Sequence, residues 1–511
     1  MPDVAAPLIH GRAWRFLLLI SVGVCAASGL VYELALLTLS TSLNGGGVVE
    51  TSLIVAGYVA ALGAGALAAK PFLRWPAVTF LTVEACLGVI GGISALVLYI
   101  VFATVGQSVI VLVLATFLIG ALVGMELPLL MTLIQQGRLA DARSTGSLLA
   151  TLNFADYLGA LIGGLAWPFI LLPSLGMIRG TLAAGMVNIV AALFIAIVLL
   201  RRIVPWRQLS VSVIALLASL AILVVLLVRS DGIVTTARQA LYRDPVIYAH
   251  QSDYQDIVVT KRGKDQRLYL NGGLQYSSRD EYRYTESLVY PALTSSTRDV
   301  LVIGGGDGLV ARELLRFGAK VTQVELDPEV VQVANTVLRS DNGGALERVQ
   351  LVHDDAFTWL RSGSLGATYD AVIIDLPDPD NPTLARLYSQ EFYRMALGVV
   401  RPGGRMVVQA SSAFTTPDVF WRVHSTLKAA GCSSVIPYHT HVPTFGDWGF
   451  QLCSPVLDMP QVSGLRYLNP EVLQASAVFG SDNQPRDLEP STLDRPFIVD
   501  DLRRGYRQAG E

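Results

Sequence analysis

The segment VLVIGGGDGLVARELL (residues 300–315) places four glycines in the five positions that follow a short apolar strand. The one position of the five that is not glycine is the fourth, which is the acidic residue Asp307. A glycine-rich turn between a strand and a helix typically binds a nucleotide, often through its phosphates. Because a carboxylate repels phosphate, this turn indicates a nucleoside ligand that carries no phosphate and that gains from a nearby negative charge.

The residues around this turn alternate between strands and helices. DVLVIG (299–304) predicts a buried strand, VARELLRFG (310–318) a helix that ends at Gly318, and KVTQVEL (320–326) a second strand. Continuous apolar strands that alternate with helices indicate a mostly parallel sheet, here an α/β Rossmann-like, class I methyltransferase-like domain. A small β-hairpin subdomain is expected before it, around the polar turn KRGKDQ. Further strands are predicted at 349–353, 369–375 and 404–410.

Acidic residues stand at the ends of three of these strands, where such sheets bind their ligands. Glu325 closes the second strand, about 20 residues past the glycine turn, and can accept both ribose hydroxyls. Asp355 follows the third strand and could accept from an adenine amino group. Asp375 ends the fourth and is followed by LPDPDNP, which adds Asp378. The alternative is that these acids cap helices or lie in a solvated turn.

The first 229 residues have a different composition. They hold 11 of the 38 basic and 7 of the 41 acidic residues, whereas the remainder has a net charge of −7. A helix needs about 20 apolar residues to cross a bilayer, and seven runs reach that length. We therefore expect a multi-pass membrane domain at 1–229, a β-rich subdomain at 230–290 and the Rossmann-like domain at 291–511. The seven runs lie near 14–40, 51–69, 76–103, 107–134, 147–174, 178–200 and 208–228.

Loop charges predict an orientation for these spans. Basic residues precede the first run and follow the second, fourth and sixth, whereas loops such as 41–50 and 103–108 carry none. The positive-inside rule then places the N-terminus in the cytoplasm, and seven crossings would leave the second half outside. The chemistry argued below favours a cytoplasmic second half, which is our expectation here and requires that one run, for example 14–40, does not cross.

Two further features of the sequence bear on function. Glu33, Glu84, Glu126 and Asp156 lie within the apolar runs, where carboxylates either mark a path for cations or pair within the bundle. The four cysteines show no CxxC or Cys/His spacing, so neither a zinc site nor a disulfide framework is predicted.

A cationic nucleoside explains Asp307. S-adenosylmethionine carries a sulfonium, but its carboxylate would lie near this turn and be repelled. Its decarboxylated form keeps the sulfonium, carries an aminopropyl ammonium and lacks the carboxylate. Asp307 would attract the second molecule and disfavour the first, which is discrimination by repulsion as well as attraction.

At this point the residues resemble a known family, the polyamine aminopropyltransferases or spermidine synthases. The resemblance covers about residues 250–455. The apolar half, with SGLVYEL (28–34), is similar to membrane-fused bacterial members. The similar segments are YLNGGLQYSSRDEYRYTE (269–286), VIGGGDG (302–308), VELD (324–327), DDAF (354–357) and DLPDP (375–379).

The resemblance implies a role for each matching residue. Asp307 would hold the aminopropyl ammonium, Glu325 the ribose, Asp354 and Asp355 the adenine side, with the turn formed by Gly304, Gly305, Gly306 and Gly308. Asp375 would be the general base and Asp378 the anchor of the second ammonium. Substrate contacts are also implied for the following residues: Gln255, Gln275, Tyr284 and Glu286.

The sequence departs from the family pattern in three places. Asn271 replaces a hairpin aspartate, Thr285 replaces the middle residue of the Y-[HQ]-E motif, and the segment VPTFGDWGF (442–450) has Pro443 or Phe445 where the family has a tyrosine. A phenolic hydroxyl is therefore missing from the expected acceptor pocket, which leaves the acceptor amine open.

The implied reaction transfers the aminopropyl group to a diamine such as putrescine, giving spermidine and methylthioadenosine. The attacking amine is protonated at neutral pH, with a pKa of about 10.4, so a carboxylate must remove its proton. We expect no permanently bound cofactor, no metal and no nucleic-acid partner, and leave a homo-oligomer open. The alternatives are a polyamine transporter or sensor whose nucleoside domain does not turn over, and an S-adenosylmethionine-dependent methyltransferase.

Overall fold

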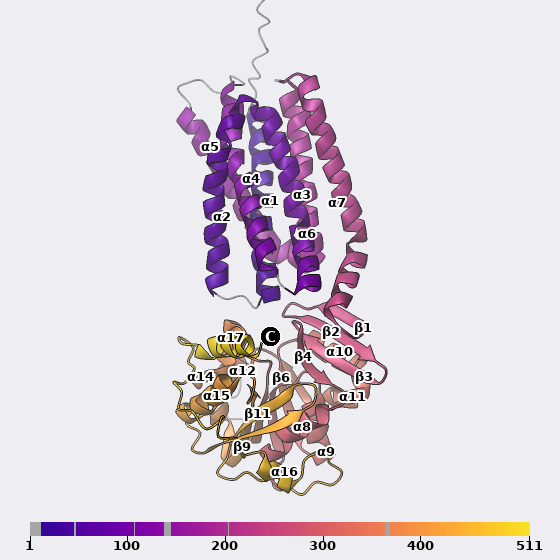
Figure 1. Cartoon of the computed structure of the whole chain (residues 1–511), viewed down its shortest axis with the longest axis vertical. Helices are drawn as coiled ribbons and strands as arrows, with labels where there is room; N and C mark the ends of the chain where they lie inside the picture. Colours follow the sequence, from indigo (N-terminus) through magenta and orange to yellow (C-terminus); the bar gives the residue numbers. More distant parts are fainter. Residues whose placement is uncertain are drawn as a thin grey trace, which may run out of the picture. The chain divides into compact units, whose positions relative to one another are not determined.

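The computed structural model describes residues 12–44, 48–106, 108–136, 145–202, 204–362 and 368–510. It divides into two compact units, Met1–Arg243 and Asp244–Glu511 (Figure 1). The boundary lies 14 residues beyond the one placed at residue 229 from composition. The last helix of the first unit continues past its apolar stretch as a polar helix, so hydropathy alone did not mark its end.

The first unit is a bundle of long helices. Among the residues that the structure describes, six helical segments are long and apolar enough to cross a membrane, and the longest of them, Leu149–Leu199, includes most of α5 and all of α6. The helices are α1 (Arg12–Asn44), α2 (Val48–Ala68), α3 (Pro76–Val105), α4 (Val109–Gln136), α5 (Thr145–Ala166), α6 (Leu172–Phe194) and α7 (Trp206–Leu241).

Small residues bring α1 and α5 into backbone contact. A Cβ added at Gly159 would lie 2.0 Å from the Gly23 carbonyl oxygen, and one added at Gly163 would lie 2.3 Å from that of Ala27. This spacing of small residues four apart is typical of helices that pack closely in membranes. The contacted residue of α1 moves from 23 to 27 as the residue of α5 moves from 159 to 163, so α1 and α5 are parallel.

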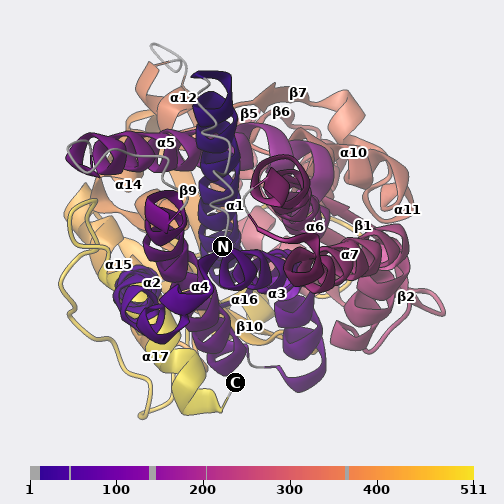
Figure 2. The same ribbon diagram turned by 90° about the horizontal axis from the view of Figure 1, so that it is seen from above.

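The contacts of α3 with α1 and α6 show how these three helices run relative to one another. Tyr32 of α1 packs on Gly91 of α3, and the Cys25 thiol bonds to Glu84, so α1 and α3 are parallel. The amide of Asn188 on α6 donates to Glu84 at 2.9 Å, whereas Gly185 packs on Gly92, so α6 is antiparallel to α3. Figure 2 shows α3, α6 and α7 grouped together and α2 beside α4.

The chain reverses at Gly176, a non-helical residue within the first turns of α6 that has φ 72° and ψ 176°. The segment Leu149–Leu199 therefore runs through the bundle twice. Helix α7 is antiparallel to α6, because Leu223 packs on Gly185 and Asp231 pairs with Arg179. Helices α1, α3, α5 and α7 thus share one direction.

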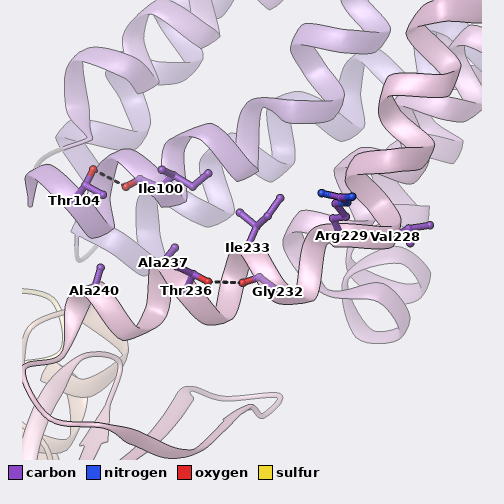
Figure 3. A pocket seen from close by; sticks show the side chains of 9 residues that line it. All are labelled: Ile100, Thr104, Val228, Arg229, Gly232, Ile233, Thr236, Ala237 and Ala240. Carbon is purple, nitrogen blue, oxygen red and sulfur yellow. Dashed lines mark hydrogen bonds between the residues drawn. The ribbon is translucent and has the colours of Figure 1, made fainter.

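An open groove lies between α3 and α7 (Figure 3). Arg229 is the single charged residue among those that line it, and none of them is acidic. Apolar atoms provide most of its surface. The lining residues are Ile100, Thr104, Val228, Arg229, Gly232, Ile233, Thr236, Ala237 and Ala240.

The second unit begins with a four-stranded antiparallel sheet. Its order is β1 (Val246–Gln251), β2 (Asp256–Arg262), β3 (Asp265–Leu270) and β4 (Gly273–Ser277). Strands β2 and β3 pair around the turn at Gly263, with Arg262 opposite Asp265. The hairpin that the sequence indicates is therefore part of a larger meander.

A seven-stranded sheet forms the centre of this unit, in the order β10-β11-β9-β8-β5-β6-β7. Neighbours from β9 to β7 are parallel, and β10 and β11 complete one edge as an antiparallel hairpin. The predicted mostly parallel Rossmann-like sheet is confirmed. The strands are β5 (Asp299–Gly304), β6 (Lys320–Glu325), β7 (Gln350–His353), β8 (Tyr369–Asp375), β9 (Val400–Ser412), β10 (Val435–Val442) and β11 (Gly446–Cys453).

The strands are apolar throughout because both faces of the sheet are covered. In β5, Leu301 and Ile303 belong to one core cluster, whereas Val300 and Val302 belong to another on the opposite face. Helix α9 (Leu309–Phe317) starts directly after the glycine turn and ends at Gly318, as predicted, with φ 91° at that residue.

One prediction about the cysteines was wrong. Cys432 and Cys453 form a disulfide, although they are 21 residues apart in the sequence. Cys453 ends β11, and Cys432 follows α15 (Pro417–Ala430), so the sheet places the two Cα atoms 5.9 Å apart. Spacing rules do not find such a pair, because tertiary structure brings the two residues together.

Candidate active site

The central strands end side by side at the point where the strand order reverses. Strand β5 lies between β6 and β8, and its last residue, Gly304, pairs with Asp375 at the end of β8. Glu325 ends β6 on the other side of β5. In sheets of this kind the ligand binds at such a reversal, beyond the carboxyl ends of the strands.

At two positions of the turn, neighbouring atoms leave no room for a side chain, so glycine is needed there. Gly304 has φ 80°, and a Cβ there would lie 2.0 Å from the carbonyl oxygen of Asp375. A Cβ at Gly306 would lie 2.7 Å from Oε2 of Glu325. The turn therefore passes close to both acids because it has no side chains at these positions.

Asp375 accepts a hydrogen bond from the Tyr284 hydroxyl at 2.6 Å. Tyr284 lies on α8 (Glu281–Val289), and its ring packs against Phe445, Trp448 and Phe450. These aromatic rings fix the direction of the phenol, and the phenol in turn fixes one oxygen of the carboxylate. Sequence comparison alone implied a substrate contact for Tyr284, and the structure pairs it directly with Asp375.

Three carboxyl groups near the turn raise each other's pKa. Burial is the main cause for each: it raises the pKa of Asp307 to about 7, that of Glu325 to about 7 and that of Asp375 to about 6. Repulsion adds to it, because Asp375 acts on Asp307 and Glu325 acts on Asp375. A cation bound among them would reverse this effect, so the site favours a positively charged ligand.

Asp378 is held by two hydroxyl groups. Its Oδ2 accepts from Ser411 at 3.0 Å and from Tyr506 at 3.1 Å. Its Oδ1 is buried and has no hydrogen-bond partner among the described residues. Burial raises the pKa of Asp378 to about 6. Ser411 is the residue before the last one of β9 and has φ 60°, a conformation that is strained for serine, and its hydroxyl donates to this carboxylate.

Two predicted site residues have structural partners. Glu286 is buried and accepts the backbone N–H groups of Arg466, Tyr467 and Leu468 at 2.8–2.9 Å. It thereby fixes the segment that follows β11. Asp355 caps α12 (Ala356–Ser362) by accepting from Thr358 N at 2.9 Å, and it also pairs with Arg386. Capping was the alternative that the sequence left open for Asp355.

The remaining predicted residues also have hydrogen-bond partners within the protein. Gln255 donates to Asp327 at 3.0 Å, and Asp327 also begins α10 (Pro328–Thr336) as its N-cap. Gln275 on β4 donates to the carbonyl of Gly273 at 3.2 Å. Asp354 accepts from the backbone N–H of Asp355 at 2.8 Å.

Sequence reasoning missed Ser411 and Tyr506. Ser411 lies at the carboxyl end of a predicted strand, a position that could have identified it. Tyr506 lies about 130 residues after Asp378 on a C-terminal helix, and no local pattern marks it. Asn271, which replaces the family's aspartate, has φ 49° and accepts from Asp256 N at 3.0 Å, so it shapes the turn before β4.

Known proteins match both the site and the whole chain. The spermine/spermidine synthase domain matches residues 281–459. A polyamine aminopropyltransferase of Corynebacterium efficiens is 70% identical over 100% of both chains. The chain belongs to the polyamine aminopropyltransferase family. It is therefore an enzyme that transfers an aminopropyl group to an amine, as the resemblance implied.

Relatives in more distant bacteria also match over the full length of the enzyme. A polyamine aminopropyltransferase of Mycobacterium tuberculosis is 57% identical over 96% of this chain and 97% of its own. One of Oceanobacillus iheyensis is 34% identical over 94% and 95%. The apolar helical half is therefore shared with these relatives.

Two solved structures match part of the chain. A spermidine synthase in complex with the transition-state analogue AdoDATO is 25% identical, with a TM-score of 0.44, over 47% of this chain and 86% of that one. The spermidine synthase from Thermotoga maritima gives a TM-score of 0.43 at the same identity and coverage.

Proposed function

We propose that this enzyme transfers the aminopropyl group of decarboxylated S-adenosylmethionine to a diamine such as putrescine. The observation that carries this proposal is the group of carboxyls around the glycine turn, Asp307, Glu325 and Asp375, whose pKa values are raised by burial and mutual repulsion. A donor with a sulfonium and an ammonium relieves that repulsion, whereas the carboxylate of S-adenosylmethionine would add to it.

The donor would lie across the ends of β5 and β6. The turn at Gly304–Gly308 accommodates the nucleoside because its backbone has no side chains toward Glu325 and Asp375. Glu325 accepts the ribose hydroxyls, and Asp307 pairs with the aminopropyl ammonium. Asp354 remains for the adenine side, since Asp355 is already bound to Arg386 and Thr358 N.

The acceptor would lie between Asp375 and Asp378. Asp375 removes a proton from the attacking amine, whose nitrogen then bonds to the methylene next to the sulfonium. The carbon–sulfur bond breaks as that bond forms, its electron pair returns to sulfur, and methylthioadenosine leaves. Tyr284 holds one oxygen of Asp375 and leaves the other for the amine.

An assay of the purified protein with decarboxylated S-adenosylmethionine and a panel of diamines tests the proposal. Formation of methylthioadenosine with a diamine supports it. Donor binding without turnover would favour the sensor alternative, and methyl transfer from S-adenosylmethionine would favour a methyltransferase.

Activity should fall on the acidic side of neutrality. The base must be ionised, and burial raises the pKa of Asp375 to about 6 and that of Asp307 to about 7. Protonation of either group removes the base or the partner of the donor, so kcat/KM should drop as pH falls through 7 to 5. A profile between pH 5 and 9 measures this, and a flat profile down to pH 5 would contradict the assigned roles.

We further propose that the catalytic unit faces away from the cytoplasm. This proposal departs from our expectation of a cytoplasmic position, which rested on where the donor is supplied. Two observations favour the opposite. Helices α1 and α7 are parallel, so the chain leaves α7 on the side opposite the start of α1, which basic loops mark as cytoplasmic. The disulfide Cys432–Cys453 is typical of oxidising compartments.

One basic residue, Arg179, departs from the pattern of loop charges, and the helix directions explain it. Arg179 lies at the end of the bundle where the other loops lack basic residues, and it pairs with Asp231 of α7. Its charge is thus offset within the unit. An outward-facing enzyme also requires that the nucleoside donor reach that side, so a transport step would have to precede transfer.

A reporter that is active only outside the cytoplasm should give a strong signal when fused after Glu511. The same reporter fused after Arg201, between α6 and α7, serves as the control and should be silent. A silent reporter after Glu511 and an active one after Arg201 would show that the catalytic unit lies in the cytoplasm. Thiol labelling of denatured, unreduced protein adds a second measurement, because Cys432 and Cys453 should react only after reduction.

A further inference from the structure

The second unit continues beyond the matched domain, which ends at residue 459. The last element of this extension is α17 (Phe497–Ala509). Ile498, Val499 and Leu502 of α17 are buried in the same core cluster as β8 and β9 residues. Asp501, which is 2% exposed, pairs with the buried Arg422 of α15. The helix is therefore fixed to the sheet that carries the candidate site.

A close approach sets the position of α17 along the sheet. A Cβ at Gly505 would lie 2.8 Å from Cγ2 of Thr416 and 3.0 Å from the carbonyl oxygen of Thr415. The helix thus rests directly on the segment after β9. The next residue, Tyr506, reaches Asp378, and its hydroxyl donates to Oδ2 at 3.1 Å.

Two acidic residues in the segment that follows β8, Asp378 and Asp380, have different partners. Asp380 is acted on by the positive charge of Arg503, one turn before Tyr506 on α17. Asp378 instead has neutral hydrogen-bond partners: Ser411 and Tyr506 donate to Oδ2, and the Gln409 side chain also favours the ionised carboxyl. Its buried Oδ1 has no partner among the described residues. Asp378 is therefore the carboxylate that a substrate ammonium can neutralise.

We propose that Tyr506 is a positioning residue for the acceptor amine and acts on it through Asp378. It supplies, from the C-terminal helix, the phenolic hydroxyl that is absent at Pro443 and Phe445 in the segment before β11. The hydroxyl holds Asp378 ionised and oriented so that Oδ1 takes the ammonium at the far end of a diamine. This inference rests on the proposed function, because it assigns part of the acceptor site.

Tyr506→Phe tests the hydroxyl while keeping the ring. A hydrogen bond to a charged group is removed, so KM for the diamine should rise about 10- to 100-fold. The kcat should stay within about threefold, and calorimetry should show unchanged binding of decarboxylated S-adenosylmethionine. Because the lost bond favours the ionised carboxyl, the acidic limb of kcat/KM for the diamine should move to higher pH.

Gln508→Ala, at an exposed position of the same helix, is the matched control and should leave all four measurements unchanged. Thermal unfolding of each variant shows whether α17 still packs, and Tyr506→Leu separates loss of the ring from loss of the hydroxyl. A wild-type KM and pH profile in Tyr506→Phe would overturn the inference alone. A wild-type protein that uses no diamine would overturn the proposed function and this inference with it.

Discussion

Asp375→Asn should lower kcat by about 10²- to 10⁴-fold, the usual effect of removing a positioned general base. The amide has the size of the carboxyl and can still accept from Tyr284 (2.6 Å in the wild-type structure), so the aromatic group around that phenol should keep its packing. Binding of the donor should change far less, because Asp307 and Glu325 remain. Single-turnover kinetics with saturating diamine, together with donor calorimetry, measure the two effects separately.

Asp378→Asn is the matched control for this variant. Asp378 is held by Ser411 and Tyr506 and would anchor the distant ammonium, so its loss should raise KM for the diamine more than it lowers kcat. Near-normal turnover in Asp375→Asn would assign the base elsewhere, and equal kinetic effects in the two variants would mean that the carboxylates act as one unit.

The second large effect concerns the choice of donor. Asp307→Asn should lower the affinity for decarboxylated S-adenosylmethionine by about 10²- to 10³-fold, as expected when one partner of a buried ion pair is removed. The affinity for S-adenosylmethionine should fall little or should rise, because its carboxylate no longer lies near a negative charge in the turn. Calorimetry with both molecules at the same pH measures the difference.

Glu325→Gln provides the comparison for that experiment. Both donors have the same ribose, so this change should lower the affinity for each of them by a similar factor. If Asp307→Asn also weakened both donors equally, Asp307 would serve the turn itself, for example through its bond to Leu309 N at 2.9 Å, and would not select between donors.

The sequence by itself determined the central sheet and the inner part of the site. Strands buried on both faces are apolar without interruption, and a glycine turn must follow the strand whose end approaches a ligand, so local pattern locates both. Glu325 and Asp375 could be found because each ends a strand, and Asp307 because it lies in the glycine turn that follows β5. Parallel strands bring their ends together whatever the rest of the fold does. The apolar runs were equally clear, because crossing a bilayer requires a minimum length.

Only the tertiary structure decided which of the other polar residues meet. Glu286 binds three backbone N–H groups of residues 466–468, and Asp355 caps a helix, although both matched family motifs. Cys432 joins Cys453, and Tyr506 reaches Asp378 across about 130 residues. Local sequence carries little information about such pairs, because each depends on how a helix packs on the sheet. Packing of that kind is set by the shapes of many side chains together, so it emerges only when the whole unit has folded.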